Sequence, residues 1–460
     1  MVDKSLTEIL STFIIETKFE NFSESIKHIT KLSILDFLGS TIAGSKTKTG
    51  KIFLKHLDDL GGKAESTVIG NGKKTSVVNA AFANGGCCHI LELDDIHKAS
   101  TVHAAAPVIP AALALSEKLN LGGKELIEAV VVGYEVAIRI GEAVNPSHYY
   151  YWHNTATCGT FGAAAATGKL LELNSDELVY ALGNAGSTAA GLWEFLRDGA
   201  MTKHLHPANA AENGVTAALL AENGFTGPKY ILEGSKGFFN AMAKEADFNK
   251  IILNLGHDYK IMENCFKLYP SCRHTHPTID AVLSLKDKYN IKHNDVKKIK
   301  IYTYAAALEI TNNFNPKSSY EAKFSLPYCA AIALIFGKPK LSHFDEQLIF
   351  DERIKNLIDR VELNISDDID RLYPVKWPAK VVIEGALDRF EEYVEYPKGD
   401  FENPASDEML IAKFKELAVP FLEENICKKI VDMVLNIEQQ KNLLKFSKLF
   451  LNQHELKNER

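Results

Sequence analysis

The sequence predicts a mainly α-helical protein with a large all-helical domain and a smaller inserted α+β lid domain. Apolar residues recur at helical spacing through most of the first 266 residues and again beyond residue 404. Between them, several segments alternate at period two, as strands do. We therefore expect a helical domain formed by residues 1–266 with 404–460, and an α+β lid formed by residues 267–403. A chain of 460 residues is also too long for one compact core.

The first part of the chain contains the clearest helical patterns. Asn174 with Glu177 three residues later is a capping pair for one helix, which Gly183 can end. Several of these helices are rich in alanine, which permits close helix packing. Only residues 66–70 resemble a strand. Helices are expected at residues 26–43, 76–83, 107–119, 124–144, 161–173 and 175–183.

The second part mixes the two periods. Strands are predicted at residues 296–304, 360–365 and 379–384, and helices at residues 277–289 and 322–336. Residues 400–404 break the pattern, and residues 406–448 return to an amphipathic helix. We expect this last segment to pack onto the first domain.

Composition and charge exclude several functions. A net charge of -7, without a basic face, argues against nucleic-acid binding. Seven cysteines without a CxxC pair suit reduced thiols, and there is neither an apolar leader nor a run of membrane-spanning length, so we expect a cytoplasmic protein that binds no membrane. Neither GxGxxG nor GxxxxGK[ST] occurs, which disfavours a nucleotide cofactor.

Residues 85–110 crowd three histidines and three carboxylates between apolar runs. Unpaired buried charge costs several kcal/mol, so these side chains need solvent or partners, and we interpret the segment as one wall of an active site. Asp94 and Asp95 would point about 100° apart on a helix, so one can face a ligand while the other holds an imidazole or caps a helix. The alternatives are an exposed acidic turn or a metal site, although the spacing matches no zinc or calcium loop.

Three further polar segments have the same character. Residues 153–162 and 199–207 each lead into an alanine-rich helical run, and residues 267–277 are rich in cations and imidazoles. His103 and His153 each precede a helix start, where a converging set of helix N-termini would bind an anion. Lys203 stands beside two histidines and could orient a carboxylate, as could Lys267 and Arg273. Read singly, each of these residues could equally be structural or solvated.

Together these segments resemble the MmgE/PrpD family, which contains 2-methylcitrate dehydratases, cis-aconitate decarboxylases and iminodisuccinate epimerases. The likeness spans nearly the whole chain. Its motifs are Leu93-Asp-Asp with His103; His153-x-Thr155 leading to Gly159-Thr-Phe-Gly; Lys203-x-Leu-His-Pro; Gly224-Phe-Thr-Gly-Pro with Leu232-Glu-Gly; Lys267-x-Tyr-Pro-Ser-Cys-Arg-x-Thr-His276; and Glu321-Ala-Lys-Phe-Ser-Leu-Pro-Tyr328.

The resemblance implies a homodimer without metal or organic cofactor and a pocket between the two domains. It implies pocket positions at Asp94, His103, His153, Lys203 and Lys267. This chain departs from the family pattern at Ala104-Ala105, where Pro-Gly is usual, and at Ala208, where Gly is usual.

The function expected from the resemblance is a cofactor-independent lyase, specifically a hydro-lyase that dehydrates a small hydroxy polycarboxylate such as 2-methylcitrate. Decarboxylation of cis-aconitate and epimerisation of iminodisuccinate remain open, as does a non-catalytic helical binding protein. The expected catalytic residues are His103, His153, Asp94 and Lys203, and the expected substrate-binding residues are Lys267, Arg273, His276 and Thr155.

Overall fold

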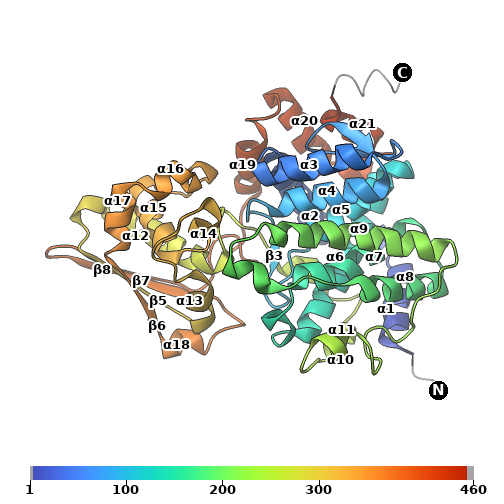
Figure 1. The fold of residues 1–460 in the computed structure, drawn as a ribbon, viewed down its shortest axis with the longest axis horizontal. Helices are drawn as coiled ribbons and strands as arrows, with labels where there is room; N and C mark the ends of the chain where they lie inside the picture. Colours follow the sequence, from blue (N-terminus) through green and yellow to red (C-terminus); the bar gives the residue numbers. More distant parts are fainter. Residues whose placement is uncertain (1–3, 453–460) are drawn as a thin grey trace. The chain divides into compact units, whose positions relative to one another are not determined.

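The computed structural model describes residues 4–452, which divide into two compact units (Figure 1). The first unit contains the residues up to Ile90, Asp94–Asn264 and the residues from Ser406 onward. The second contains Leu91–Leu93 and Cys265–Ala405. The protein is 59% helical and only 9% strand, so the predicted mainly α class is confirmed.

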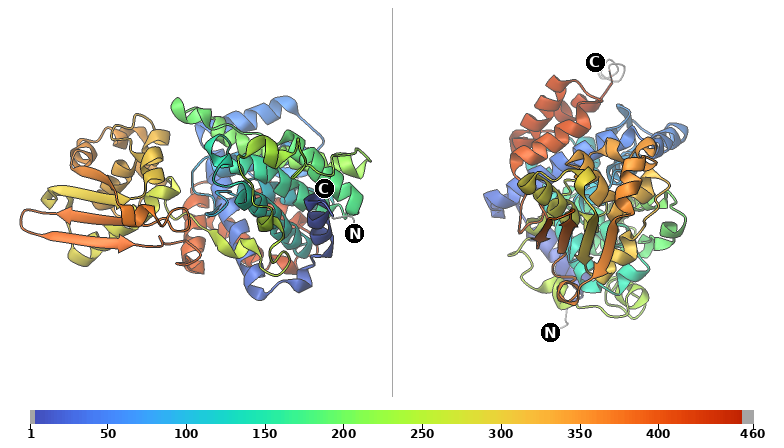
Figure 2. Two further views of the ribbon diagram at one scale, coloured as in Figure 1. Left: turned by 90° about the horizontal axis from the view of Figure 1, so that it is seen from below. Right: turned by 90° about the vertical axis from the view of Figure 1, so that its left-hand side faces the viewer.

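The first unit is built almost entirely of helices. Helices α19 and α20, at the end of the chain, pack on α2, and Figure 2 shows them beside the N-terminal helices. The helices are α1 (Leu6–Glu16), α2 (Glu24–Ser45), α3 (Lys48–Leu60), α4 (Val77–His89), α5 (Ala105–Lys118), α6 (Gly123–Val144), α7 (Asn154–Leu170), α8 (Ser175–Thr188), α9 (Thr202–Glu222), α10 (Phe238–Met242), α11 (Asn249–Ile252), α19 (Asp407–Ala418), α20 (Glu424–Leu435) and α21 (Leu444–Ser447).

Short elements complete the first unit. Strands β1 (Ser66–Val68) and β2 (Lys73–Thr75) form an antiparallel pair. The other short elements are β3 (Ile96–His97), β4 (Asn264–Cys265) at the unit boundary, and the 3-10 helices η1 (Phe19–Asn21), η2 (His148–Tyr150), η3 (Trp193–Arg197), η4 (Lys260–Glu263), η8 (Ile437–Gln439) and η9 (Lys448–Phe450).

Helices α4, α5, α6, α7 and α9 form the core of this unit, with many side chains fully buried. Gly133 of α6 and Gly162 of α7 face each other where these two helices meet. A Cβ added to Gly162 would lie 2.6 Å from the Gly133 carbonyl oxygen, so only glycine permits this approach. Close packing of α6 on α7 thus depends on these two glycines.

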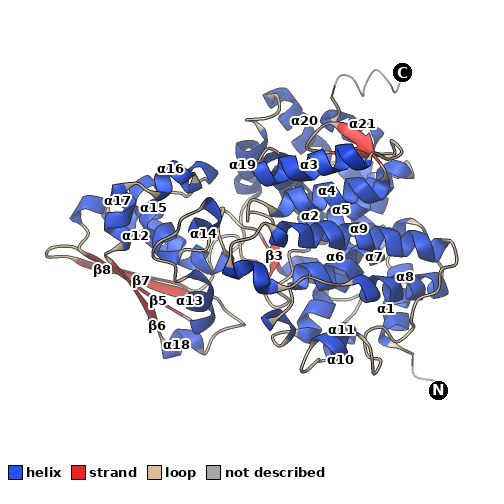
Figure 3. Cartoon of the chain, viewed as in Figure 1, coloured by secondary structure: helices blue, strands red, loops and turns tan. Residues whose placement is uncertain are grey.

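The second unit is an α+β arrangement around one four-stranded sheet (Figure 3). The strand order is β6-β5-β7-β8, with β5 parallel to β6 and the other pairs antiparallel. Helix α12 packs on β7 and β8, and α15 packs on α12. Its elements are β5 (Lys298–Thr303), β6 (Val361–Ile365), β7 (Ala379–Glu384), β8 (Arg389–Val394), α12 (His276–Tyr289), α13 (Ala305–Thr311), α14 (Ser319–Lys323), α15 (Leu326–Phe336), α16 (Glu346–Ile349), α17 (Glu352–Ile358), α18 (Asp367–Asp370), η5 (Arg273–Thr275), η6 (His293–Asp295) and η7 (Leu341–Phe344).

The structure corrects several predicted boundaries. The helix expected at residues 161–173 begins seven residues earlier, at Asn154, because the small polar residues at its start are buried in the helix rather than in a loop. The predicted capping pair of Asn174 and Glu177 is present, but Gly183 does not end its helix, which continues to Thr188.

Two segments predicted to be helical contain more than one helix. Residues 322–336 are divided between α14 and α15, because the Ser325 hydroxyl caps a new helix that has Pro327 in its first turn. The helical segment expected at residues 406–448 consists of three α-helices and a 3-10 helix. Strands β2 and β8 were not predicted.

Candidate active site

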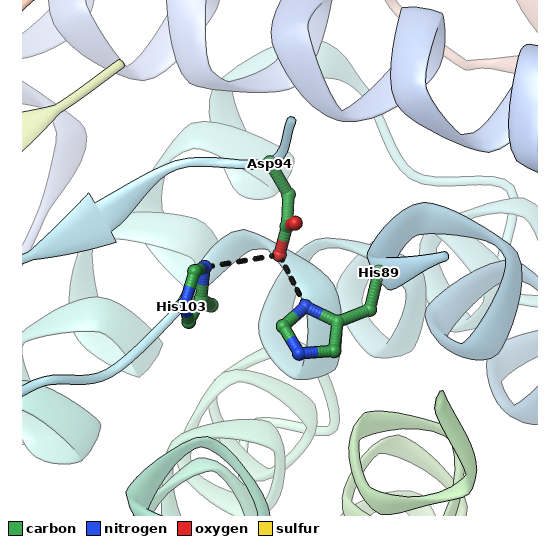
Figure 4. Close-up of side chains that lie close together, drawn as sticks. All are labelled: His89, Asp94 and His103. Carbon is green, nitrogen blue, oxygen red and sulfur yellow. Dashed lines mark hydrogen bonds and ion pairs between the residues drawn. The ribbon is translucent and has the colours of Figure 1, made fainter. Parts of the chain in front are cut away.

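Asp94 is the centre of a buried group of side chains in the first unit. It follows α4, and its Oδ2 lies 2.6 Å from His89 Nδ1 and 3.3 Å from His103 Nδ1 (Figure 4). Burial alone would raise the pKa of Asp94, but the imidazoles of His89 and His103 lower it well below its ordinary value. Asp94 is therefore a carboxylate that holds two imidazole rings.

Three helix N-termini carry the other predicted catalytic residues. His103 lies two residues before α5, His153 is the N-cap residue of α7, and Lys203 is in the first turn of α9. These three helices pack against one another in pairs. The N–H groups of a first helical turn have no partner within the helix, so each N-terminus adds positive potential suited to an anion.

His153 connects Asp94 and its imidazoles to α9. Its ring stacks on His89 with centroids 5.4 Å apart and lies 4.8 Å from the Trp193 ring. Its Nδ1 lies 3.1 Å from His206 Nδ1, so one of the two rings donates and the other accepts. Burial, followed by neighbouring charges including Lys203, lowers the pKa of His153 well below its ordinary value.

Burial also lowers the pKa of His206 to about 4, with further contributions from His89 and Lys203. His153 and His206 are consequently neutral near pH 7. Lys203 itself is only 3% exposed, and His204 lies beside His89 with ring centroids 6.5 Å apart. We use the term imidazole cluster for Asp94, Lys203 and the five histidines around them, namely His89, His103, His153, His204 and His206.

Two polar side chains fix the backbone around His103. Thr155 Oγ1 accepts a hydrogen bond of 3.1 Å from the His103 N–H. Asp95 Oδ1 accepts one of 3.1 Å from the N–H of Ala105, at the start of α5, whose N-cap residue makes no side-chain cap. The two neighbouring aspartates thus have different partners: Asp94 lies against imidazoles, and Asp95 caps a helix.

Asp95 has two further partners at its other oxygen. Its Oδ2 accepts hydrogen bonds from the Tyr134 hydroxyl at 2.6 Å and from the Asn264 amide at 2.8 Å. Burial raises the pKa of Asp95 to about 7, although the Tyr134 hydrogen bond acts in the opposite direction. The buried Asp95 side chain therefore fixes the backbone near His103 through its contacts with Ala105, Tyr134 and Asn264.

The remaining predicted site residues belong to the second unit. Lys267 Nζ lies 3.3 Å from a Glu92 carboxylate oxygen, and both side chains are buried. The Arg273 guanidinium pairs with Asp400, and it donates to His276 Nδ1 at 2.8 Å. Of the predicted set, the structure thus groups Asp94, His103, His153, Thr155 and Lys203 in one unit, and Lys267, Arg273 and His276 in the other.

His89, His204 and His206 were not among the site residues predicted from the sequence. His89 ends α4, five residues before Asp94, and it was obscured by the neighbouring cysteines and apolar residues. His204 and His206 were recognised only as neighbours of Lys203. His206, three residues after Lys203, would share a helix face with it and could have been assigned to the site, whereas His204 would point about 100° away.

Two groups of described residues have the donor types and spacing to hold a metal ion. The ligand atoms of His89, Asp94 and His103 lie within 4.8 Å of one another, and the second group is His97, Glu142 and Glu263. Neither spacing in sequence resembles a known metal loop, because each group is assembled by the fold.

No helix in the described part of the chain combines the length and the apolar character that a membrane crossing requires.

Comparison with known proteins identifies two consecutive family domains. Residues 8–251 match the MmgE/PrpD N-terminal domain, and residues 269–439 match the MmgE/PrpD C-terminal domain. A cis-aconitate decarboxylase of Aspergillus terreus is 29% identical over 437 residues, covering 89% of this chain and 88% of the relative.

Two other relatives extend this comparison. A human cis-aconitate decarboxylase is 27% identical over 461 residues, covering 95% of this chain and 93% of the relative. A 2-methylcitrate dehydratase of Escherichia coli K12 is 23% identical over 374 residues, covering 74% of this chain and 76% of the relative.

Proposed function

This chain belongs to the MmgE/PrpD family, and we propose that it is a lyase that decarboxylates a small tricarboxylate of the cis-aconitate type. The observation that carries this proposal is the imidazole cluster, in which a carboxylate, neutral imidazoles and Lys203 gather at three helix N-termini. The proposed substrate is anionic, and this arrangement offers it cations, N–H groups and proton donors in one place.

Decarboxylation makes two demands on such a site. When the carbon–carboxylate bond breaks, its electron pair stays on the substrate, and conjugation with the double bond and a remaining carboxylate spreads the charge. Lys203 and the helix N-termini stabilise that charge. An imidazole then delivers a proton to carbon, so that the products are carbon dioxide and an unsaturated dicarboxylate.

We assign the proton delivery to His103 or His153. Asp94 orients the His103 ring and provides the negative charge that a proton-carrying imidazole needs beside it. His153 is kept neutral by burial and by nearby positive charge, including that of Lys203, and it shares a hydrogen bond with His206. A neutral imidazole can accept a proton from one group and return one to another.

Dehydration of a 2-methylcitrate-like hydroxy acid, the reaction expected from the sequence, is the second candidate. The comparisons favour decarboxylation over it, because the similarity to the cis-aconitate decarboxylases extends over 89–95% of this chain and the similarity to the dehydratase over 74%. Dehydration would use the same groups differently, since a base would remove a proton next to a carboxylate and an acid would protonate the departing hydroxide.

The experiment that tests the proposal incubates the purified full chain separately with cis-aconitate, 2-methylcitrate, citrate and iminodisuccinate. We expect carbon dioxide release from cis-aconitate and slower or no conversion of the others. Water loss from 2-methylcitrate without carbon dioxide release would establish the second candidate. No conversion of any compound, together with no shift in melting temperature, would support the non-catalytic binding protein.

A further inference from the structure

We propose that His89, Asp94 and His103 form a binding site for a divalent transition-metal ion such as Zn²⁺, and that an ion bound there inhibits the enzyme. The proposal that the ion binds does not depend on which reaction the protein catalyses, whereas the proposal that it inhibits rests on the proposed function. The ion would bind to catalytic groups and block them, and it would take no part in the reaction itself.

The geometry of the three side chains suits such an ion. Both imidazole Nδ1 atoms lie against the same carboxylate oxygen, at 2.6 Å from His89 and 3.3 Å from His103. Ligand atoms around a tetrahedral zinc ion with bonds of about 2.0–2.1 Å are about 3.3 Å apart. The contact of Asp94 with His103 already has this spacing, and the contact with His89 must lengthen by about 0.7 Å.

The carboxylate also retains unused coordinating capacity. Asp94 Oδ1 is buried and has no hydrogen-bond partner among the described residues, so it is available to an ion bound at Asp94. Two imidazoles and a carboxylate are ligands that suit zinc, cobalt, nickel and copper better than magnesium or calcium. An ion bound to the two Nδ1 atoms would displace any proton that either of them carries.

The second group of potential ligands provides an internal comparison. Glu142 and Glu263 lie beside His97, but Lys260 Nζ is 3.1 Å from Glu142 and 3.2 Å from Glu263. This ammonium already pairs with both carboxylates and competes with any other cation for them. We therefore expect a metal ion to bind at Asp94 and not at Glu263.

A bound ion would remove the groups that the proposed reaction uses. Coordination occupies the lone pair of His103 and the negative charge of Asp94, so the ring can neither be oriented by the carboxylate nor exchange a proton at that nitrogen. Since the ligands must be deprotonated, metal binding and inhibition should both weaken as pH falls.

The test measures Zn²⁺ binding to the full chain, without substrate, by isothermal titration calorimetry. We expect one ion per chain, with binding at least tenfold weaker in Asp94→Asn and in His89→Gln and unchanged in the matched control Glu263→Gln. With Co²⁺ as the probe, visible absorption bands should appear in the wild type and in the control only. His103→Gln serves as a third variant if either of the others fails to fold.

No binding by the wild type, unaltered binding in all three site variants, or loss of binding in Glu263→Gln would overturn the metal site. A second titration then measures turnover, which added Zn²⁺ should inhibit. A chelator should restore the turnover of the zinc-inhibited enzyme and should leave the turnover of enzyme without added zinc unchanged. Zinc that binds without inhibiting would contradict only the inhibitory role. Absence of turnover on every substrate would affect the proposed function and leave the binding result valid.

Discussion

At the scale of single residues, the proposed chemistry depends on His103, His153 and Lys203. We expect each alanine variant to lower kcat/KM by about a hundredfold or more, the size of effect of losing a positioned acid or base or one oxyanion donor. Lys203→Arg should also lower kcat/KM, because a planar guanidinium does not replace a compact ammonium. Steady-state kinetics on the best substrate, with unfolding curves as a folding check, measures both.

The matched control for these variants is His28, an imidazole of the same unit that is partly exposed and paired with Asp407. His28→Ala should retain wild-type turnover. If all three alanine variants in the imidazole cluster also retain it, the catalytic assignment fails.

The pH dependence of stability gives a second residue-scale prediction. The pKa of His206 is about 4 in the folded chain against an ordinary value of 6.5. Between these pH values the unfolded chain binds a proton at His206 that the folded chain does not bind. The free energy of unfolding therefore rises with pH between about 4 and 6.5, and this gain in stability is lost again as the pH falls towards 4. The effect is on the order of 3 kcal/mol over this range.

Urea unfolding of the wild type and of His206→Gln at several pH values isolates this contribution. The stability of the wild type relative to the variant should increase from about pH 4.5 to pH 7. A difference that is constant with pH, or that decreases, would show that His206 does not have a lowered pKa in the folded chain.

The sequence predicted the site residues that stand in polar segments and missed a residue whose contacts are made only by the fold. Asp94, His103, His153 and Lys203 stood in polar segments beside predicted helix starts, and the structure places them in one cluster. His89 was one of the three histidines in the polar segment 85–110 but was not singled out, because it follows small apolar residues at the end of a helix. Its role arises from the turn after α4, which brings Asp94 back against it.

At the scale of elements, Asp95 is predicted to be a positioning residue that fixes the start of α5 and so the place of His103. Asp95→Ala would leave the Ala105 N–H, the Tyr134 hydroxyl and the Asn264 amide without an acceptor. We expect a loss of about 2–5 kcal/mol in the free energy of unfolding and a lower kcat.

The conservative variant separates positioning from charge. Asp95→Asn resembles the protonated carboxyl and keeps an oxygen for Ala105, so it should retain most of the stability and kcat that Asp95→Ala loses. Tyr134→Phe removes one donor only and should cost less than Asp95→Ala. Equal loss of kcat in Asp95→Asn and Asp95→Ala would indicate that the charge of Asp95 is needed directly.

Sequence periodicity predicted elements well where burial follows a simple pattern. The strand at residues 379–384 was predicted with the bounds that β7 has, because its apolar residues face a packed helix layer. Strand β8 was missed because Arg389–Val394 is exposed or half-buried throughout and carries charged residues, as an edge strand does. Its strand conformation depends on pairing with β7, which the local sequence does not encode.

At the scale of the whole molecule, we propose that the functional unit is a homodimer, as the family resemblance implied. Light scattering of the full chain after size-exclusion chromatography should give twice the mass of one chain at micromolar concentration. Dilution should lower specific activity only when the dimer dissociates. A fully active monomer would contradict this proposal.

The central claim is that the imidazole cluster decarboxylates a tricarboxylate, and the most direct measurement is proton NMR of cis-aconitate treated with the full chain in D₂O. We expect an unsaturated dicarboxylate to form with one solvent deuteron incorporated at carbon for each molecule converted, and about a hundredfold slower conversion by Lys203→Ala. Unchanged cis-aconitate, or conversion at an equal rate by Lys203→Ala, would contradict the account.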